Sequence, residues 1–204
     1  MMTQVLYVTR HGETDWNRIG RLQGHTDIPL NETGRAQAQA LGDKLRDMQI
    51  AAVGSSDLVR AHETAHIVAR RLGVEHLHVD PDLRERAFGL FEGLTRTECG
   101  SRYPEEWTAW SQDSRSTPPG AEPHDVLSAR ALRAARRAAE VHARKKGAVL
   151  LVSHGGTIRA LLHAIGAPPA GSIPNTALYR IEYSRGEFVS AGLAPGLEPL
   201  EHTA

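Results

Sequence analysis

The sequence has little cysteine, no net charge and no long apolar run. Its single cysteine, Cys99, excludes an internal disulfide framework and a zinc-cysteine cluster, which favours a cytoplasmic setting. The 24 basic side chains balance 24 acidic ones, so no overall field attracts nucleic acid or an anionic membrane. No stretch reaches the roughly 18 apolar residues of a membrane span, and the first residues lack the features of a signal peptide. We therefore expect neither nucleic acid nor a membrane as a partner.

Length and composition predict one domain. The chain has 204 residues, of which 40% are hydrophobic, and this is enough for one sizeable core. We expect a single domain over residues 1–194. An irregular, lid-like insertion is expected at about residues 95–124, where tryptophan, serine and proline interrupt the helical pattern. Residues 195–204 are expected to form a flexible tail, and a homodimer is left open.

Extended and helical patterns alternate along the chain. Strands are expected at residues 5–8, 50–53, 74–79 and 149–153, and helices at residues 33–47, 57–72, 125–146 and 157–165. Ser55 and Ser56 are expected to cap the second helix. Two late extended runs, residues 177–183 and 187–193, predict a hairpin. This order predicts an α/β fold, a three-layer α/β/α sandwich with a mostly parallel central sheet and a late antiparallel edge hairpin.

Two His-Gly pairs follow apolar strands. Residues 10–14 read Arg-His-Gly-Glu-Thr, and residues 153–156 read Ser-His-Gly-Gly. Strand tips of this kind can meet at one edge of an α/β sheet. A neutral imidazole at His11 can attack phosphorus if an acceptor holds its other ring nitrogen, and Arg10 offers a planar fork of donors for phosphate oxygens. Because the chain has 11 histidines, one such pair alone would indicate only an ordinary loop histidine.

Further segments complete a recognisable pattern. They are Asn17, residues 24–34, the Ser-Asp-Leu-Val-Arg-Ala run at residues 56–61, Leu-Arg-Glu at residues 83–85, and residues 88–93. With the two His-Gly pairs, they resemble the histidine phosphatase superfamily, also called the phosphoglycerate mutase-like family. The likeness extends from Val5 to about Tyr183.

The resemblance implies a role for each matching residue. His11 would be the nucleophile that forms a phosphohistidine, and Glu85 would be the general acid and base. The other implied site residues, which surround the phosphoryl group, are Arg10, Asn17, Arg60, His154 and Gly155, with Gln23 assigned on the resemblance alone. Two arginines with histidine and amide donors can stabilise a phosphomonoester without a metal, so no metal or cofactor is expected. Arg60 lies in the first turn of a helix, where the dipole disfavours a cation, so anion binding explains it better than capping does.

Within this family the sequence favours a phosphatase over a mutase. Cofactor-dependent mutases of the family carry a longer insertion with adjacent arginines, whereas residues 91–125 are short and contain only the separated Arg96, Arg102 and Arg115. We therefore expect a hydrolase for a small phosphorylated metabolite. The alternative is a 2,3-bisphosphoglycerate-dependent phosphoglycerate mutase, an isomerase. The sequence does not choose among phosphomonoester substrates.

Two features of the chain have competing interpretations. Residues 62–66 read His-Glu-Thr-Ala-His, which matches a zinc-peptidase motif and makes a zinc hydrolase using His62 and His66 a remote alternative. The same helix carries the family match, so we expect both histidines on its solvent side. In the insertion, Trp107 and Trp110 could stack on a substrate or anchor the insertion to the core, and the anchoring role is favoured.

Overall fold

The computed structural model describes residues 3–74, 76–142 and 146–194. The flexible tail expected at residues 195–204 lies outside the described residues. The strands are β1 (Gln4–Arg10), β2 (Ile50–Ser55), β3 (His76–Val79), β4 (Ala148–Ser153), β5 (Leu178–Ser184) and β6 (Glu187–Leu193). The helices are α1 (Asp15–Arg18), α2 (Glu32–Lys44), α3 (Val59–Leu72), α4 (Arg96–Arg102), α5 (Pro104–Gln112), α6 (His124–His142) and α7 (Gly155–Ala164), with short 3-10 turns at Pro81–Leu83 and Gly89–Phe91.

The described strands form one sheet of six, in the order β3-β2-β4-β1-β5-β6. β1, β2, β3 and β4 pair in parallel, whereas β5 pairs antiparallel with β1 and with β6. The predicted mostly parallel sheet with a late antiparallel hairpin is therefore confirmed. Of the hairpin, β6 forms the edge and β5 lies between β1 and β6.

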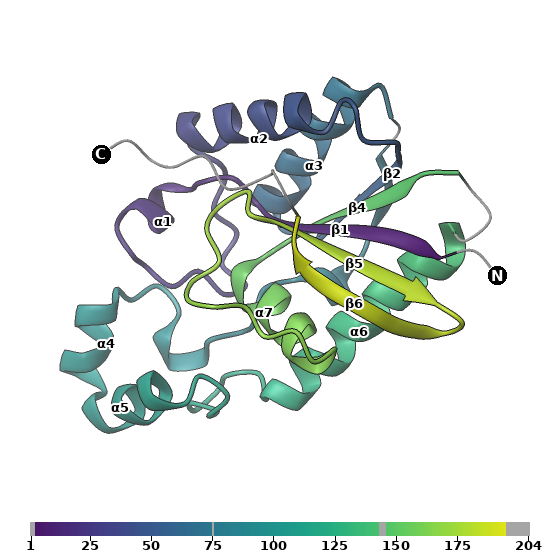
Figure 1. Ribbon diagram of the computed structural model, residues 1–204. Helices are drawn as coiled ribbons and strands as arrows, with labels where there is room; N and C mark the ends of the chain where they lie inside the picture. The colour runs from purple at the N-terminus through teal and green to yellow at the C-terminus, as the bar shows by residue number, and fades with distance from the viewer. Residues whose placement is uncertain (1–2, 75, 143–145, 195–204) are drawn as a thin grey trace.

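Helices cover both faces of this sheet, as Figure 1 shows, with α2 and α3 on one side and α6 and α7 on the other. The alternation of side chains along β1 explains the arrangement. Leu6 and Val8 belong to the core cluster with α6 and α7, while Tyr7 between them packs with residues of α2 and α3. A strand buried on both faces reads as a continuous apolar run, and β1 does so. The predicted three-layer sandwich is confirmed.

The insertion differs from the prediction. Instead of an irregular segment, it contains the helices α4 and α5. Thr95 and Glu98 form a capping box that starts α4, and Pro104 occupies the first turn of α5, where its missing N–H costs nothing. These local signals outweigh the tryptophan, serine and proline content on which the prediction depended.

The start of α3 also differs from the prediction. α3 begins at Val59 rather than at residue 57, and its N-cap residue, Leu58, makes no side-chain cap. The Ser56 hydroxyl instead accepts a hydrogen bond from the Leu58 N–H, so it closes the turn before the helix. The described part of α6 ends at His142, and residues 143–145, which were expected to be helical, lie outside the described residues. Within the described ranges, every helix is too short or too polar to cross a bilayer.

The strand register brings the two His-Gly pairs together. Arg10 at the end of β1 is the register partner of Ser153 at the end of β4, and the His11 N–H donates to the Ser153 carbonyl at 3.0 Å. Ser55 at the end of β2 is the register partner of Val152 in β4. The prediction that these strand tips meet at one edge of the sheet is confirmed, because parallel strands end at the same edge.

Candidate active site

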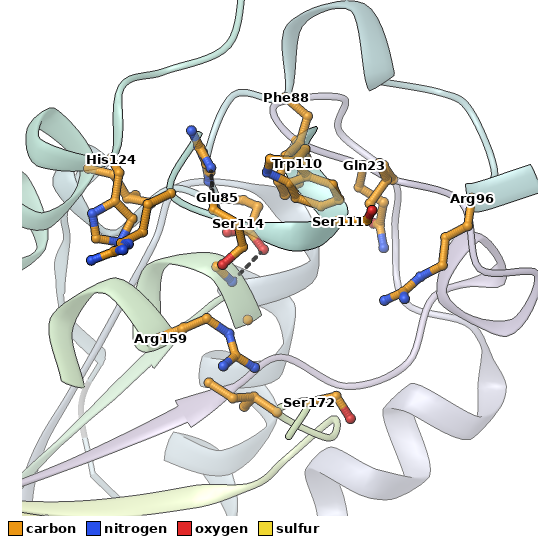
Figure 2. Close-up of a pocket in the computed structure, with 18 of the residues that line it drawn as sticks. Gln23, Glu85, Phe88, Arg96, Trp110, Ser111, Ser114, His124, Arg159 and Ser172 are labelled. Atoms are coloured by element: carbon orange, nitrogen blue, oxygen red, sulfur yellow. Dashed lines mark hydrogen bonds between the residues drawn. The ribbon is translucent and has the colours of Figure 1, made fainter. Parts of the chain in front are cut away.

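A cavity of about 880 Å³ opens at this edge of the sheet. The sequence-predicted residues that line it are Arg10, His11, Asn17, Gln23, Arg60, Glu85 and Gly155. His154 is fully buried, and its ring centroid lies 5.1 Å from that of His11. Figure 2 shows the insertion residues Trp110 and Ser111 on one side of the cavity and Arg159 and Ser172 on another. The structure therefore brings all the predicted site residues into one region.

The ring of His11 is held in one orientation by its own neighbour. Nδ1 lies 2.6 Å from the Gly12 carbonyl oxygen, and because a carbonyl only accepts, Nδ1 carries the proton. Nε2 is thereby left with a lone pair. Burial, with Arg60 and Arg10 close by, lowers the pKa of His11 well below its ordinary value. His11 is thus a neutral imidazole at neutral pH, with Nε2 as the nucleophilic atom.

His154 has the opposite tautomer. Nε of Arg60 donates to Nδ1 of His154 at 3.2 Å, so Nδ1 accepts and Nε2 carries the proton. Burial, followed by the charge of Arg60 and the ring of His11, lowers the pKa of His154 well below its ordinary value. The buried Nε2 has no hydrogen-bond partner among the described residues. His154 therefore presents a neutral N–H donor beside the nucleophile.

Two guanidinium groups border His11, that of the buried Arg60 and that of the partly buried Arg10, and neither forms an ion pair with a carboxylate in the described part of the chain. Arg10 donates from Nη1 to the Ile173 carbonyl at 2.7 Å, and its buried Nε has no partner among the described residues. Arg60 donates to the carbonyls of Thr26 and Gly24 at 2.9 and 2.8 Å. Burial lowers the pKa of Arg60 to about 10, so the side chain stays charged at neutral pH. Such desolvated cations favour a bound anion.

The carboxyl group of Glu85 is held by the first turn of α7. Oε2 accepts from the Gly156 N–H at 3.1 Å, and Oε1 accepts from the Thr157 N–H at 3.1 Å and from the Arg86 N–H at 2.9 Å. These backbone N–H groups fix the position of the carboxyl group at the start of α7. A Cβ atom at Gly156 would lie only 2.5 Å from Oε1, so a glycine is required for this contact.

The two predicted amide residues, Asn17 and Gln23, differ in their hydrogen bonds. Asn17 accepts through Oδ1 from the Thr14 N–H at 3.2 Å, as part of the capping box of α1, which leaves its NH₂ group for the cavity. Gln23 is buried, and its Oε1 has no partner among the described residues. Asn175 was missed by the sequence analysis. Its Nδ2 donates to the His11 carbonyl at 2.8 Å and to Asn17 Oδ1 at 3.3 Å, and no motif surrounds it in the sequence.

A second missed residue, Arg130 of α6, supports the segment that carries Glu85. It donates to the backbone carbonyls of Asp82, Arg84 and Glu85 at 2.6 to 2.9 Å. It also makes two hydrogen bonds of 2.7 Å to the carboxylate of Glu122, at the end of the insertion. In the sequence, Arg130 is one of several arginines in an alanine-rich helix, so only its burial reveals this role.

The zinc motif on α3 does not form a cluster. His62 and His66 are exposed, as predicted, and Glu63 pairs with Arg35 at 2.7 Å. In the described ranges, no group of three or more histidine, cysteine, aspartate or glutamate side chains is arranged to hold a metal. Thr64 faces inward instead, and its hydroxyl accepts from the Gly12 N–H at 3.1 Å. Within this motif, Thr64 thus contacts the turn that carries His11.

The insertion tryptophans pack against the protein core and also line the cavity. Trp107 and Trp110 lie 5.6 and 5.8 Å from the Phe91 ring by their centroids and 5.4 Å from one another. Both also line the cavity. The predicted packing role is confirmed, and the same rings form one wall of the site.

Fold and site together define a class of protein, an α/β protein in which two buried histidines, two arginines and a glutamate meet at one edge of the sheet. The sequence profile of the histidine phosphatase superfamily (branch 1) matches residues 6–194. The chain therefore belongs to this superfamily, and it is an enzyme, since its relatives are phosphatases and phosphoglycerate mutase-like enzymes.

Individual relatives cover most of the chain. Phosphoglycerate mutase-like protein 4 of Arabidopsis thaliana is 41% identical over 159 residues, covering 76% of this chain and 68% of that protein. The metal-independent phosphoserine phosphatase of the same plant is 38% identical over 181 residues, covering 87% and 75%. Among solved structures, a mycobacterial glucosyl-3-phosphoglycerate phosphatase superposes with a TM-score of 0.82 at 30% identity, covering 98% of this chain and all of that one.

Proposed function

We propose that this enzyme is a metal-independent phosphomonoester hydrolase that acts on a small phosphorylated metabolite through a phosphohistidine at His11. The observation that carries the proposal is the hydrogen bond from Nδ1 of His11 to the Gly12 carbonyl, which leaves Nε2 as a nucleophile. Two arginines without carboxylate partners in the described part of the chain, Arg10 and the buried Arg60, lie around this nucleophile. A phosphomonoester carries about −1.5 to −2 charges near neutral pH and suits such a site.

The donors of the site match the oxygens of a phosphoryl group. Arg10 Nε and His154 Nε2 are buried donors without a partner among the described residues, and phosphate oxygens would accept from both. Arg60 supplies charge, and Asn17 its amide NH₂ group. Gly155 lies beside Arg10, and a Cβ at this position would occupy the space 3.6 Å from Arg10 Nε, so the glycine leaves that space to the anion. In this arrangement, protein cations and N–H groups stabilise the transition state.

The reaction then runs in two steps. In the first, Nε2 of His11 attacks phosphorus, the ester P–O bond breaks, and the leaving oxygen takes the proton of the Glu85 carboxyl group. In the second, water attacks the phosphohistidine while the Glu85 carboxylate takes a proton from it. The P–N bond breaks, its electron pair returns to Nε2, and inorganic phosphate leaves.

A phosphatase is favoured over the alternative, a 2,3-bisphosphoglycerate-dependent phosphoglycerate mutase. The insertion has no pair of adjacent arginines to hold a second substrate group during transfer. The relatives include proteins named as phosphatases and proteins named as phosphoglycerate mutases, so the preference for a phosphatase rests on the insertion. Release of phosphate from phosphomonoesters without priming by 2,3-bisphosphoglycerate would support the hydrolase, and release only after priming would support the mutase.

The test compares the unaltered protein with His11→Asn and with a matched control, His66→Asn, which changes an exposed histidine of α3. With p-nitrophenyl phosphate in the presence of EDTA, His11→Asn should lose at least about 1000-fold in kcat, and the control should retain full activity. Rapid acid quenching should trap an acid-labile, base-stable phosphoenzyme only when residue 11 is histidine. Equal activity of His11→Asn would refute the proposal. Loss of activity with EDTA, or in a His62→Ala/His66→Ala variant, would favour the zinc alternative.

A further inference from the structure

One face of α7 continues along the cavity beyond the phosphoryl site. Gly155, Arg159 and His163 follow one another at intervals of four residues, and all three line the cavity. Residues four apart share a helix face, and they are separated by about 6 Å along the axis. The face therefore begins beside Arg10, which lies next to Gly155, and presents Arg159 about one turn further on.

The guanidinium group of Arg159 has no carboxylate partner among the described residues. It donates from Nη2 to the Gly171 carbonyl oxygen, and its other donors have no assigned acceptor there. By contrast, Arg21 and Arg115 at the same cavity pair with Glu98 and Asp113, both at 3.1 Å. Figure 2 shows Arg159 extending into the cavity between Glu85 and Ser172. Arg159 is half-buried. Because it lacks a carboxylate partner among the described residues, its positive charge is available to a substrate in the cavity.

A single loop positions Arg159 and Arg10 relative to one another. Arg10 donates from Nη1 to the Ile173 carbonyl at 2.7 Å, and Arg159 donates to Gly171 of the same loop. Two residues of chain span at most about 7 Å, so these two acceptors are close together. The two guanidinium groups are therefore held by the same short stretch of loop, and an anion bound to Arg159 would lie in the same cavity as a phosphoryl group held by Arg10.

We propose that Arg159 binds a second anionic group of the substrate, a carboxylate or a phosphate, and so selects phosphomonoesters that carry another negative charge a few bonds from the ester. The inference rests on the proposed function, because it takes Arg10 and His11 as the site of the transferred phosphoryl group. The planar fork of an arginine suits both kinds of oxyanion. The spacing of Gly155 and Arg159 along α7 thus determines which separation between the two anionic groups of a substrate fits the site.

The test uses substrates matched in all but the second charge. 3-Phosphoglycerate is compared with glycerol 3-phosphate, which replaces the carboxylate by a hydroxymethyl group, and propane-1,3-diyl bisphosphate is compared with propyl phosphate. The unaltered enzyme should prefer the doubly anionic member of at least one pair by about 10- to 100-fold in kcat/KM. The carboxylate pair and the bisphosphate pair distinguish the two kinds of anion.

Arg159→Met keeps much of the side-chain stem and removes the charge. It should abolish the preference through a higher KM for the doubly anionic substrate, with a much smaller change in kcat/KM for glycerol 3-phosphate. Arg159→Lys should keep part of the preference. Arg136→Met, at an exposed position of α6 away from the cavity lining, is the matched control and should keep all of it. An unchanged preference in Arg159→Met, or no preference in the unaltered enzyme, would overturn the inference while leaving the phosphatase proposal intact.

Binding gives a readout that does not depend on turnover. Titration calorimetry with 3-phosphoglycerate and with glycerol 3-phosphate should show tighter binding of the former, and only when residue 159 is arginine. If no phosphomonoester is hydrolysed, the proposed function is wrong, and the same titrations still decide whether Arg159 holds the second anion. Equal affinities for the two compounds would then refute the subsite.

Discussion

Nε of Arg60 donates a hydrogen bond to Nδ1 of His154 at 3.2 Å, and both side chains are fully buried. The bond links the first turn of α3 to the tip of β4, and it fixes which ring nitrogen of His154 carries the proton. A buried charge thus orients a buried neutral donor, and neither residue has a carboxylate ion-pair partner among the described residues.

Arg60→Lys should disable the enzyme, because an ammonium group cannot reproduce the three directed hydrogen bonds of Arg60 to His154, Thr26 and Gly24. We expect a loss of about 100-fold in kcat/KM for a phosphomonoester, corresponding to about 3 kcal/mol. Arg35→Lys, which changes an exposed arginine paired with Glu63, should have almost no effect. Steady-state kinetics of the two variants tests this, and a similar loss in both would contradict it.

Gly156→Ala should displace the carboxyl group of Glu85, since the new Cβ would lie 2.5 Å from Oε1. The expected result is a fall of about 10- to 100-fold in kcat with a smaller change in KM, as for a misplaced acid and base. Gly192→Ala is the control, because a Cβ there meets nothing within 4 Å. If Gly156→Ala were as active as Gly192→Ala, the assignment of Glu85 would be wrong.

Stability should fall in mild acid because of the buried histidines. Burial lowers the pKa of His154 well below its ordinary value of about 6.5, so below that pH the unfolded chain binds a proton that the folded protein does not. The contribution of neutral His154 to the free energy of unfolding is fully present above the ordinary pKa. It is lost at up to about 1.4 kcal/mol per pH unit as the pH falls toward the folded-state pKa.

His154→Gln removes this titration and should flatten the decline by that amount. Urea unfolding of both proteins between about pH 7 and pH 5 measures the difference in slope. His66→Gln, at an exposed position, should leave the slope unchanged. Parallel curves for His154→Gln and the unaltered protein would show that the pKa of His154 is the same in the folded and the unfolded chain.

Arg130→Met should be strongly destabilising, because it removes the guanidinium partner of the Glu122 carboxylate and the hydrogen bonds that Arg130 donates to three backbone carbonyls. Breaking a buried ion pair costs about 3 to 5 kcal/mol, and Glu122→Gln in the same variant should recover part of it. Arg133→Met of the same helix removes an exposed pair with Asp82 and should cost at most about 1 kcal/mol. Chemical denaturation of the four proteins tests this, and equal losses for Arg130→Met and Arg133→Met would contradict it.

Local pattern was sufficient for much of the fold. The apolar runs that became β1 and β4 are buried on both faces, so they read as continuous hydrophobic segments. α3 shows its inward face as a helical repeat of Ala61, Ala65 and Val68. The prediction for the insertion was wrong because it relied on composition and did not use two local signals for helix starts, the capping box at Thr95 and Pro104 in the first turn of α5.

The sequence by itself determined the strand tips that carry Arg10, His11 and His154, because parallel strands separated by helices must end at one edge of a sheet. Only the tertiary structure decided which nitrogen of each histidine bears a proton, that Asn175 and Arg130 support the site, and that Arg159 lacks a carboxylate partner in the described part of the chain. These properties arise from contacts between residues far apart along the chain. Burial and hydrogen-bond direction are fixed only when the helices and loops have packed, so no local motif encodes them.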